Sequence, residues 1–215
     1  MAGRLVIVGC GGTGRQIVDV VRAVNDRMDA AGRWDLLGFV DDRPAPVDLD
    51  RVKRIDAAFL GAPDLIAGLG GGVSYVLGIG YSQVRAEVAR RIERYAPAAT
   101  ALVHPAASVG RDTVLSEGAV LSAGVRVDTN VTVGRHVHVN FNATVAHDTT
   151  LGDFVTVSPL AAISGTCDLE ERVLVGTNAA VLQGRRLGAG CTVGAGACVV
   201  RDVPPGVVVK GVPAR

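Results

Sequence analysis

The chain of 215 residues is 48% hydrophobic but only 4% aromatic, and its 22 basic and 21 acidic residues leave a formal net charge of +1. Because phosphate binding requires a concentrated basic face, this balance argues against a nucleic-acid-binding protein, and the aliphatic content argues against disorder. A core of Val, Leu, Ile and Ala with 28 glycines favours thin, repetitive β-structure over bulky aromatic packing.

The first elements along the chain read as a strand, a glycine turn and a helix. Residues 4–8 (RLVIV) have the composition of a buried strand, and the turn GCGGTG over 9–14 leads into an amphipathic segment over 16–28. Further strands are predicted over 36–40 and 74–79, and a second helix over 82–95. With three or four strands, residues 1–98 are expected to form a small parallel α/β domain, about half of a Rossmann fold, with its ligand at the carboxyl ends of the strands.

Nothing in the sequence favours a membrane span or a secreted protein. Residues 65–84 carry no charge, but six glycines break the run, so a loop followed by a buried strand is expected instead of a spanning helix. The amino-terminal apolar run is short and lacks a signal-peptide pattern. The four cysteines show neither CxxC spacing nor a disulfide framework. A cytoplasmic protein without membrane insertion is therefore expected.

A strict six-residue repeat occupies the second half of the chain. From Val103 to Val199 every sixth residue is Val, Leu or Ile, in 17 of 17 positions and with no insertion. The positions four residues further on, from Ala107 to Val203, are small or apolar except at Arg185. This period matches neither an α-helix nor an alternating strand. We therefore expect a coil with flat sides, in which each six-residue unit is one short strand and a corner.

In such a coil the aliphatic residue of each unit points inward and stacks on its copies above and below. The small residue takes the second inward position, and Gly, Asn or Asp serves the corner. Three sides need three six-residue units a turn, so residues 99–203 would give between five and six turns. At roughly 1.5–3 kcal/mol for each buried aliphatic side chain, the column is a sufficient core. Residues 204–215 would form a C-terminal tail.

The repeat resembles that of the hexapeptide-repeat acyltransferases, which implies a left-handed parallel β-helix, an exception to the usual right-handed crossover. The whole arrangement, a half-Rossmann domain ahead of this β-helix, resembles the sugar acetyltransferase family. Its members N-acetylate nucleotide-linked 4-amino-sugars or O-acetylate sialic acids. The matching motifs are VGCGGTG at 8–14, FVDD at 39–42, GIG at 78–80, VHP at 103–105, NFNATVAHDTTLGDFVTVSP at 140–159 and VVKGVPAR at 208–215.

The resemblance implies an acetyl-CoA-dependent N-acetyltransferase acting on a nucleotide-linked amino-sugar, with O-acetylation of sialic acid or a related sugar as the alternative. In the family the small domain binds the nucleotide. On this chain the phosphates would be cradled by Gly9, Gly11, Gly12, Thr13 and Gly14, the base or ribose would meet Asp41 and Asp42, and Gly80 and Tyr81 would line the cleft. The acidic pair could instead hold the ribose of NAD in a dehydrogenase, but no substrate domain of that class follows.

For catalysis, the family pattern V-x-H-[ED]-x-x-[LIV]-G matches VAHDTTLG. By this match His147 is the general base and Asp148, in place of the usual Glu, orients its ring. Acetyl-CoA would lie along successive coils, on Thr156, Gly165, Gly176, Thr177, Gly194 and Lys210. The amide of Gly165 would hold the thioester carbonyl. Many family members have a second His in place of Thr156.

A flat side of the coil cannot enclose a pantetheine arm by itself. The resemblance accordingly implies a homotrimer with each active site in the groove between two chains. His147 would come from one chain and parts of the acetyl-CoA site from its neighbour.

Other interpretations of the same sequence are weaker. His136 and His138 are two residues apart, but their spacing does not match the three-histidine zinc sites of hexapeptide-fold carbonic anhydrases, so no metal is expected. His104 would cap or pack in its His-Pro context. An acetyl-cysteine intermediate is disfavoured because Cys167 and Cys191 fall on inward positions, where thiols are usually inert. A non-catalytic nucleotide-sugar-binding module is the alternative from a different class.

Overall fold

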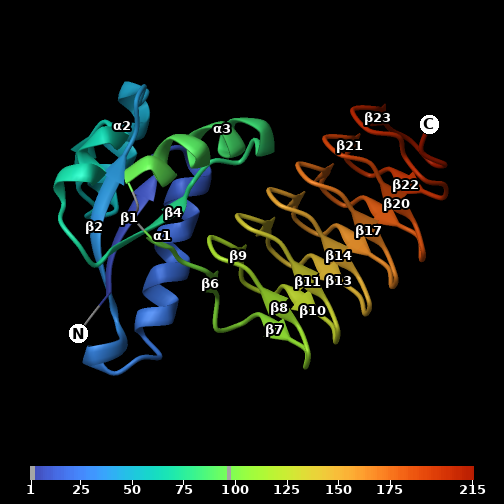
Figure 1. Cartoon of the computed structure of the whole chain (residues 1–215), viewed down its shortest axis with the longest axis horizontal. Helices are drawn as coiled ribbons and strands as arrows, with labels where there is room; N and C mark the ends of the chain where they lie inside the picture. The colour runs from blue at the N-terminus through green and yellow to red at the C-terminus, as the bar shows by residue number, and fades with distance from the viewer. Residues whose placement is uncertain (1–2, 96–97) are drawn as a thin grey trace.

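The computed structural model describes residues 3–95 and 98–215. It has two parts, an amino-terminal α/β domain and a β-helix whose coils stack away from that domain toward the C-terminus (Figure 1). The fold class expected from the sequence, a half-Rossmann domain followed by a left-handed parallel β-helix, is confirmed.

The α/β domain is built on a five-stranded parallel sheet with the strand order β3-β2-β1-β4-β5. This order, in which the chain moves outward in both directions from β1, is of the Rossmann type. The strands are β1 (Gly3–Val8), β2 (Trp34–Val40), β3 (Phe59–Gly61), β4 (Val73–Leu77) and β5 (Ala98–Ala99), the α-helices are α1 (Gly12–Asn25), α2 (Pro46–Arg54) and α3 (Ser82–Ile92), and the 3₁₀ helices are η1 (Ala30–Gly32), η2 (Pro63–Gly68) and η3 (Glu93–Tyr95).

The central strand β1 is buried on both faces. Leu5 and Ile7 pack in one cluster with Ile17 of α1, whereas Val6 and Val8 pack in a second cluster with Ala89 of α3. The two sets alternate because successive side chains of a strand point to opposite faces. A parallel strand covered on both sides needs an unbroken apolar run, and this explains the sequence RLVIV.

The structure differs from the sequence interpretation of this domain in two details. Helix α1 begins at Gly12, inside the glycine turn predicted over 9–14, and not at residue 16. The short strands β3 and β5 bring the sheet to five strands instead of three or four, because such short runs show no hydrophobic period. The uncharged run 65–84 contains a loop followed by the buried strand β4, as expected. No helix in the described part of the chain could span a membrane.

The β-helix consists of three parallel sheets, one on each side of the coil. Their strand orders are β22-β19-β16-β13-β10-β7, β20-β17-β14-β11-β8 and β23-β21-β18-β15-β12-β9-β6. We call the outer surfaces of these sheets face I, face II and face III in that order. A strand pairs with the third strand after it along the chain, as Thr144 of β13 pairs with Ala162 of β16. One turn therefore takes three six-residue units, as the repeat predicts.

Every strand of the β-helix is equally short. The strands are β6 (Leu102–Val103), β7 (Ser108–Val109), β8 (Val114–Leu115), β9 (Val120–Leu121), β10 (Arg126–Val127), β11 (Thr132–Val133), β12 (His138–Val139), β13 (Thr144–Val145), β14 (Thr150–Leu151), β15 (Thr156–Val157), β16 (Ala162–Ile163), β17 (Asp168–Leu169), β18 (Leu174–Val175), β19 (Ala180–Val181), β20 (Arg186–Leu187), β21 (Thr192–Val193), β22 (Cys198–Val199) and β23 (Val208–Val209).

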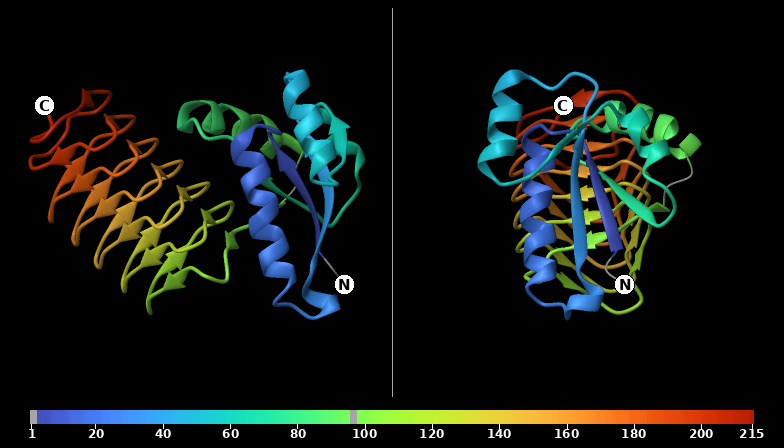
Figure 2. Two further views of the ribbon diagram at one scale, coloured as in Figure 1. Left: turned by 180° about the vertical axis from the view of Figure 1, so that it is seen from behind. Right: turned by 90° about the vertical axis from the view of Figure 1, so that its left-hand side faces the viewer.

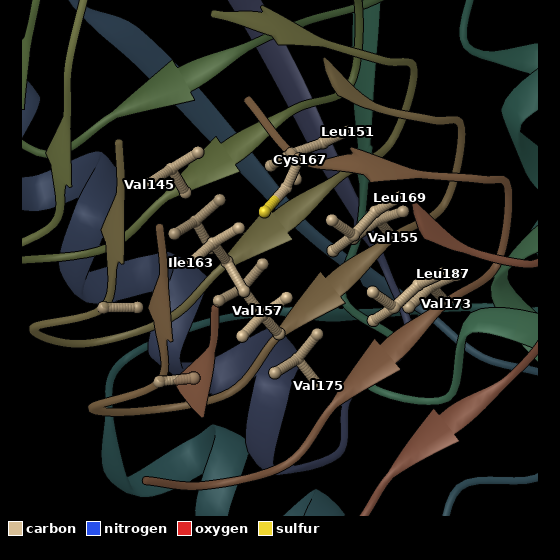
Figure 3. Close-up of a cluster of buried hydrophobic side chains, with 14 of the residues drawn as sticks. Val145, Leu151, Val155, Val157, Ile163, Cys167, Leu169, Val173, Val175 and Leu187 are labelled. Atoms are coloured by element: carbon tan, nitrogen blue, oxygen red, sulfur yellow. The ribbon is translucent and has the colours of Figure 1, made fainter. Parts of the chain in front are cut away.

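The inward aliphatic side chains form the core of the β-helix in stacked columns (Figure 3). Val157 and Val175 lie one above the other, and both are completely buried. The second inward series is buried in the same way, as at Val155 and Val173. The first coil is the exception, because Val109 has no coil before it on its side and is 39% exposed.

The corners of the coil have a left-handed backbone at every sixth residue from Asp112 to Gly196. Most of these residues are Gly, Asn or Asp, as expected, since they adopt this conformation with little strain. The exceptions are His136, Phe154, Leu160, Thr166 and Arg172. Of these, His136, Phe154 and Arg172 follow one another at intervals of one full turn, on the edge between faces II and III. That edge is where α3 meets the β-helix: the side chains of His136 and Phe154 lie in this contact, and the hydroxyl of Ser82 donates to the backbone carbonyl of Arg172.

The last residues, expected as a separate C-terminal tail over 204–215, contribute to the coil. Strand β23 pairs with β21 on face III, with Thr192 opposite Val208. The regular register, set by the pairing of Leu174 with Thr192, would place Lys210 opposite Thr192 instead. The final turn is therefore shortened where the six-residue repeat ends.

The α/β domain packs on face III and on the edge between faces II and III. Leu102 and Val120 of face III belong to the same apolar cluster as Ile17 of α1, and α1 lies between its own sheet and the coils (Figure 2). Phe154 belongs to the cluster beneath α3. The two parts thus share two apolar clusters, which fixes their relative placement.

The stacked columns predict how strongly one inward residue stabilises the fold. Replacing the completely buried Leu169 with alanine should lower the free energy of unfolding by about 2–5 kcal/mol, because the cavity cannot close between two rigid coils. Replacing Leu182, which is 45% exposed on the outside of the coil, should change it by less than about 0.5 kcal/mol. Denaturant unfolding measures both, and equal losses would contradict the columnar core.

Candidate functional site

A cleft of about 690 Å³ opens at the carboxyl ends of the strands in the α/β domain. Its walls include Gly9 after β1, Asp41 and Asp42 after β2, Ile79 after β4, and Arg91 of α3. In open parallel sheets this is where ligands bind, because the loops diverge there and helix N-termini point into the gap. The cleft therefore lies where the sequence predicts the nucleotide site.

The glycine turn at this cleft divides into close-packed and open positions. Gly9 has a φ of +100°, and a Cβ at Gly14 would lie 1.9 Å from the Gly9 carbonyl oxygen. A Cβ at Gly78 would lie 2.5 Å from the Cα of Gly14. Gly14 thus lets α1 approach β1 and β4. Gly11 and Gly12, in contrast, have open space around them at the start of α1, where amide groups can meet an anion.

The two aspartates expected to meet the base or ribose have different surroundings. The carboxylate of Asp41 accepts hydrogen bonds from the amides of Cys10 (3.0 Å) and Arg43 (2.9 Å), so it also fixes the turn. Burial and the Asp41 carboxylate raise the pKa of the Cys10 thiol to about 12, so this cysteine is not a nucleophile. Asp42 forms an ion pair of 2.7 Å with Arg91.

The remaining predicted cleft residues lie at the loop before α3. Tyr81 is 76% exposed. A Cβ at Gly80 would lie 3.1 Å from Oγ1 of Thr13, so this loop touches the glycine turn. The structure therefore brings the loop and the turn together at one end of the sheet.

The predicted catalytic pair does not line this cleft, and it lies at a corner of the β-helix between β13 and β14. Nδ1 of His147 is 2.7 Å from a carboxylate oxygen of Asp148, so the aspartate is long enough to reach the imidazole ring. Asp148 reaches it from a left-handed corner conformation with φ 59°. Both side chains are about half exposed.

Asn130 completes this site and was not predicted from the sequence. Its side-chain amide donates a hydrogen bond of 2.7 Å to the other carboxylate oxygen of Asp148. This hydrogen bond, followed by the one with His147, holds the pKa of Asp148 below its usual value. Asn130 lies one coil before Asp148, and only the register of the coils makes the two residues neighbours. That register could have revealed it.

Gly165 lies directly against the imidazole, one coil further on. A Cβ at this position would be 2.7 Å from Cε1 and 2.8 Å from Nε2 of His147. No side chain larger than hydrogen can therefore stand there with the ring in place. The absence of a side chain at Gly165 therefore makes room for the imidazole ring.

The other predicted acetyl-CoA residues lie on a different edge. Gly176, Thr177 and Gly194 follow strands of face III, at the edge between faces III and I, and a Cβ at Gly194 would lie 3.1 Å from Cβ of the exposed Lys210. His147 and Gly165 lie on the edge between faces I and II. The two groups border the same face I from opposite sides, so one chain does not bring them together.

Thr156 is buried between the two parts of the chain and faces the α/β domain. Its hydroxyl accepts a hydrogen bond of 2.8 Å from Arg85 and lies 3.4 Å from the carbonyl oxygen of Gly80. Contact of Thr156 with an acetyl donor stays a prediction. Arg85, which the sequence analysis did not identify, is completely buried.

The other histidines have structural surroundings. Nδ1 of His104 accepts the amide of Ala106 at 3.0 Å and so caps a turn, as expected. His136 and His138 are buried between the two parts, and burial lowers the pKa of His136 to about 4 and that of His138 well below its usual value. Within residues 3–95 and 98–215, no three His, Cys, Asp or Glu side chains gather as a metal site would require.

The inward cysteines are buried as the repeat predicts. Burial raises the pKa of Cys191 to about 11 and also raises that of Cys167. A thiol of this kind is protonated at neutral pH and is a poor nucleophile. These surroundings argue against an acetyl-cysteine intermediate.

Comparison with known proteins gives matches over the whole chain. Residues 4–92 match the family model described as the PglD N-terminal domain. A GDP-perosamine N-acetyltransferase from Escherichia coli O157:H7 is 31% identical to this chain, over 97% of this chain and 94% of that protein.

Two solved structures are similar along the full length. One is a histidine-to-asparagine mutant of perosamine N-acetyltransferase from Caulobacter crescentus in complex with CoA and GDP-perosamine, with a TM-score of 0.86, 27% identity and coverage of 100% of this chain and 97% of that chain. The other is the acetyltransferase domain of PglB from Neisseria gonorrhoeae in complex with acetyl coenzyme A, with a TM-score of 0.87, 28% identity and coverage of 100% and 99%.

The close contact at Gly165 predicts a specific loss in the Gly165→Ala variant. The new methyl group should push the half-exposed imidazole outward and break its hydrogen bond with Asp148, while the coil stays folded. NMR should then show loss of the hydrogen-bonded Nδ1 proton of His147. The matched control is Gly68→Ala, where a Cβ meets nothing within 4 Å. An unchanged Nδ1 signal in Gly165→Ala would contradict this placement of the ring.

Proposed function

The chain belongs to the nucleotide-sugar N-acetyltransferases of the hexapeptide-repeat family, and we propose that it transfers the acetyl group of acetyl-CoA to the amine of a nucleotide-linked amino-sugar, with His147 as the general base. The observation that carries this proposal is the hydrogen-bonded set of Asn130, Asp148 and His147. It stands in a chain that is 31% identical over nearly its whole length to a GDP-perosamine N-acetyltransferase.

The proposed base acts through the Nε2 atom of His147. The Asp148 carboxylate accepts a hydrogen from Nδ1, so the lone pair of the neutral ring lies on Nε2, next to Gly165. Asn130 holds the second carboxylate oxygen and thereby fixes the direction of the first. As the amine nitrogen attacks the thioester carbon, its proton passes to Nε2. The carbon–sulfur bond then breaks and the thiolate of CoA leaves.

The acetyl group would lie against Gly165. Its backbone amide would donate to the thioester oxygen, where negative charge develops during attack. Supporting this, the absence of a side chain at Gly165 leaves the backbone at contact distance from the imidazole. The pantetheine arm and the phosphates of CoA would follow Gly176, Thr177, Gly194 and Lys210 of a neighbouring chain, because within one chain these residues border face I on the side opposite to His147.

The nucleotide would occupy the cleft of the α/β domain. Gly9 lines this cleft, and the diphosphate would extend past it to Thr13 and to the open amides of Gly11 and Gly12 at the N-terminus of α1, which lie outside the cleft wall itself. The base or ribose would meet Asp41 and Asp42 on the opposite wall. Gly14 contributes by letting the helix approach, not by touching phosphate.

The proposed site is shared between chains. The α/β domain of a chain covers its own face III, whereas its His147 lies on the opposite edge, between faces I and II. A nucleotide-sugar in the cleft can therefore reach only the His147 of another chain. Face I supports such packing, because Thr144, Ala162 and Ala180 give it small outward side chains. A cyclic trimer places each edge against the next chain.

Replacing His147 with alanine should lower kcat for acetyl transfer by about 10²–10⁴-fold, because the attacking amine loses its proton acceptor. Release of CoA with a panel of nucleotide-linked amino-sugars measures this. Acetyl-CoA should raise the melting temperature of variant and parent equally, since binding stabilises the folded state by mass action. The control His104→Ala removes a histidine that only caps a turn. Unchanged turnover in His147→Ala would remove the base assignment.

A site shared between chains predicts complementation between two inactive variants. Gly12→Glu should block phosphate binding, because a carboxylate would fill the open space at the start of α1. Trimers assembled from equal amounts of this variant and His147→Ala should regain about a quarter of the parent activity, since random mixing restores that share of the sites. Mixed trimers without activity would show that cleft and histidine act within one chain.

A further inference from the structure

Arg85 is a buried cation whose hydrogen-bond acceptors among the described residues are all neutral oxygen atoms. It lies in the first turn of α3, and its side chain is completely buried where the α/β domain meets the β-helix. Burial lowers its pKa to about 9, so the guanidinium keeps its charge at neutral pH. A buried guanidinium needs a hydrogen-bond acceptor for each of its donors. The acceptors of Arg85 come from two parts of the structure.

The first side is the loop between β4 and α3. Nη1 of Arg85 donates to the carbonyl oxygens of Ile79 at 2.7 Å and Gly80 at 3.1 Å. These are consecutive residues at the mouth of the nucleotide cleft, whose wall includes Ile79. One guanidinium nitrogen therefore holds two successive peptide groups of the loop.

The second side is the β-helix. The acceptors there are the carbonyl oxygens of His136 (2.9 Å), Phe154 (2.9 Å) and Val155 (3.3 Å) and the hydroxyl of Thr156 (2.8 Å). They belong to two neighbouring coils, at and beside the edge between faces II and III. The cleft loop and the β-helix are thereby joined through a single planar side chain with fixed geometry.

The direction of the two loop carbonyls has a consequence for the amide groups. In a trans peptide the N–H points opposite to the carbonyl. With the carbonyls of Ile79 and Gly80 turned toward Arg85, the N–H groups of Gly80 and Tyr81 point away from it. They add to the amides at the N-terminus of α3, which together form an electropositive edge suited to an anion.

We propose that Arg85 is a positioning residue for the nucleotide: it holds the loop 79–81 so that its amides face the diphosphate, and it ties this loop to the coils of the β-helix. This role rests on the proposed nucleotide site. The neighbouring interface contact between Tyr75 Oη and Nε2 of His136, at 3.5 Å, joins the same two parts without touching the loop. It therefore provides a matched control.

The test compares Arg85→Met, Arg85→Lys and Thr156→Val with the control Tyr75→Phe. Calorimetry measures the affinities for GDP, UDP and acetyl-CoA, and hydrogen exchange measures the protection of the amides of residues 79–81. We expect Arg85→Met to weaken nucleoside diphosphate binding about tenfold or more, because a loosened loop must be ordered on binding. Its affinity for acetyl-CoA should stay within about twofold, and the loop amides should exchange faster.

The two milder variants keep the proposal testable if Arg85→Met does not fold. Arg85→Lys keeps the charge but has fewer donors, so it should recover part of the nucleotide affinity. Thr156→Val removes one acceptor on the β-helix side and should give a smaller change in the same direction. Tyr75→Phe should leave both affinities and the loop exchange at parent values.

A lower melting temperature with unchanged nucleotide affinity and unchanged loop exchange would overturn the proposal and leave Arg85 a purely structural residue. Equal weakening by Tyr75→Phe would do the same. If the parent protein binds neither GDP nor UDP, the proposed nucleotide site fails. The exchange measurement then decides on the positioning alone, since faster exchange in Arg85→Met supports it and unchanged exchange rejects it.

Discussion

The structure depends on one constraint, the stacking of each inward aliphatic side chain on its copy in the next coil. Because Val157 must lie on Val175, the chain can neither gain nor lose a residue between them without moving one of them out of the core. The same register brings Asn130, Asp148 and the Gly165 region to one edge from three successive coils. The candidate site is therefore a consequence of how the core is packed.

Much of this could be read from the sequence, for a definite physical reason. A solenoid repeats its local environment, so the six-residue period alone predicts that residues such as Val157 point into the core. The motif around His147 resembles a known family pattern. Asn130 was not identified from the sequence because its role depends on a contact across coils. As a corner residue, this asparagine is also accounted for by its left-handed backbone alone. Arg85 was not identified from the sequence because an arginine in an amphipathic helix is usually exposed.

The two parts of the chain use glycine for different purposes. In the α/β domain, Gly14 and Gly78 allow a helix and two strands to approach one another. In the β-helix, Gly165 leaves room for an imidazole from the previous coil. The buried Arg85 joins these two regions, since it contacts the loop after β4 and two coils at once. Most acceptors of Arg85 are backbone carbonyl oxygens. The contact therefore restricts the direction of the backbone at these residues more than it restricts which side chains they carry.

The shortened final turn shows how this architecture can change length. Strand β23 joins face III although the chain between it and β21 is shorter than a full turn, so the coil tolerates a break in register at its free end. An insertion of one complete turn after Gly165 would lengthen the β-helix and leave His147 beside the same residues of its own chain, Asp148 and Gly165. An insertion of less than one turn before His147 would instead move this histidine to another edge of the β-helix. The C-terminal end can therefore change in length more freely than the rest of the β-helix, because no later coil depends on its register.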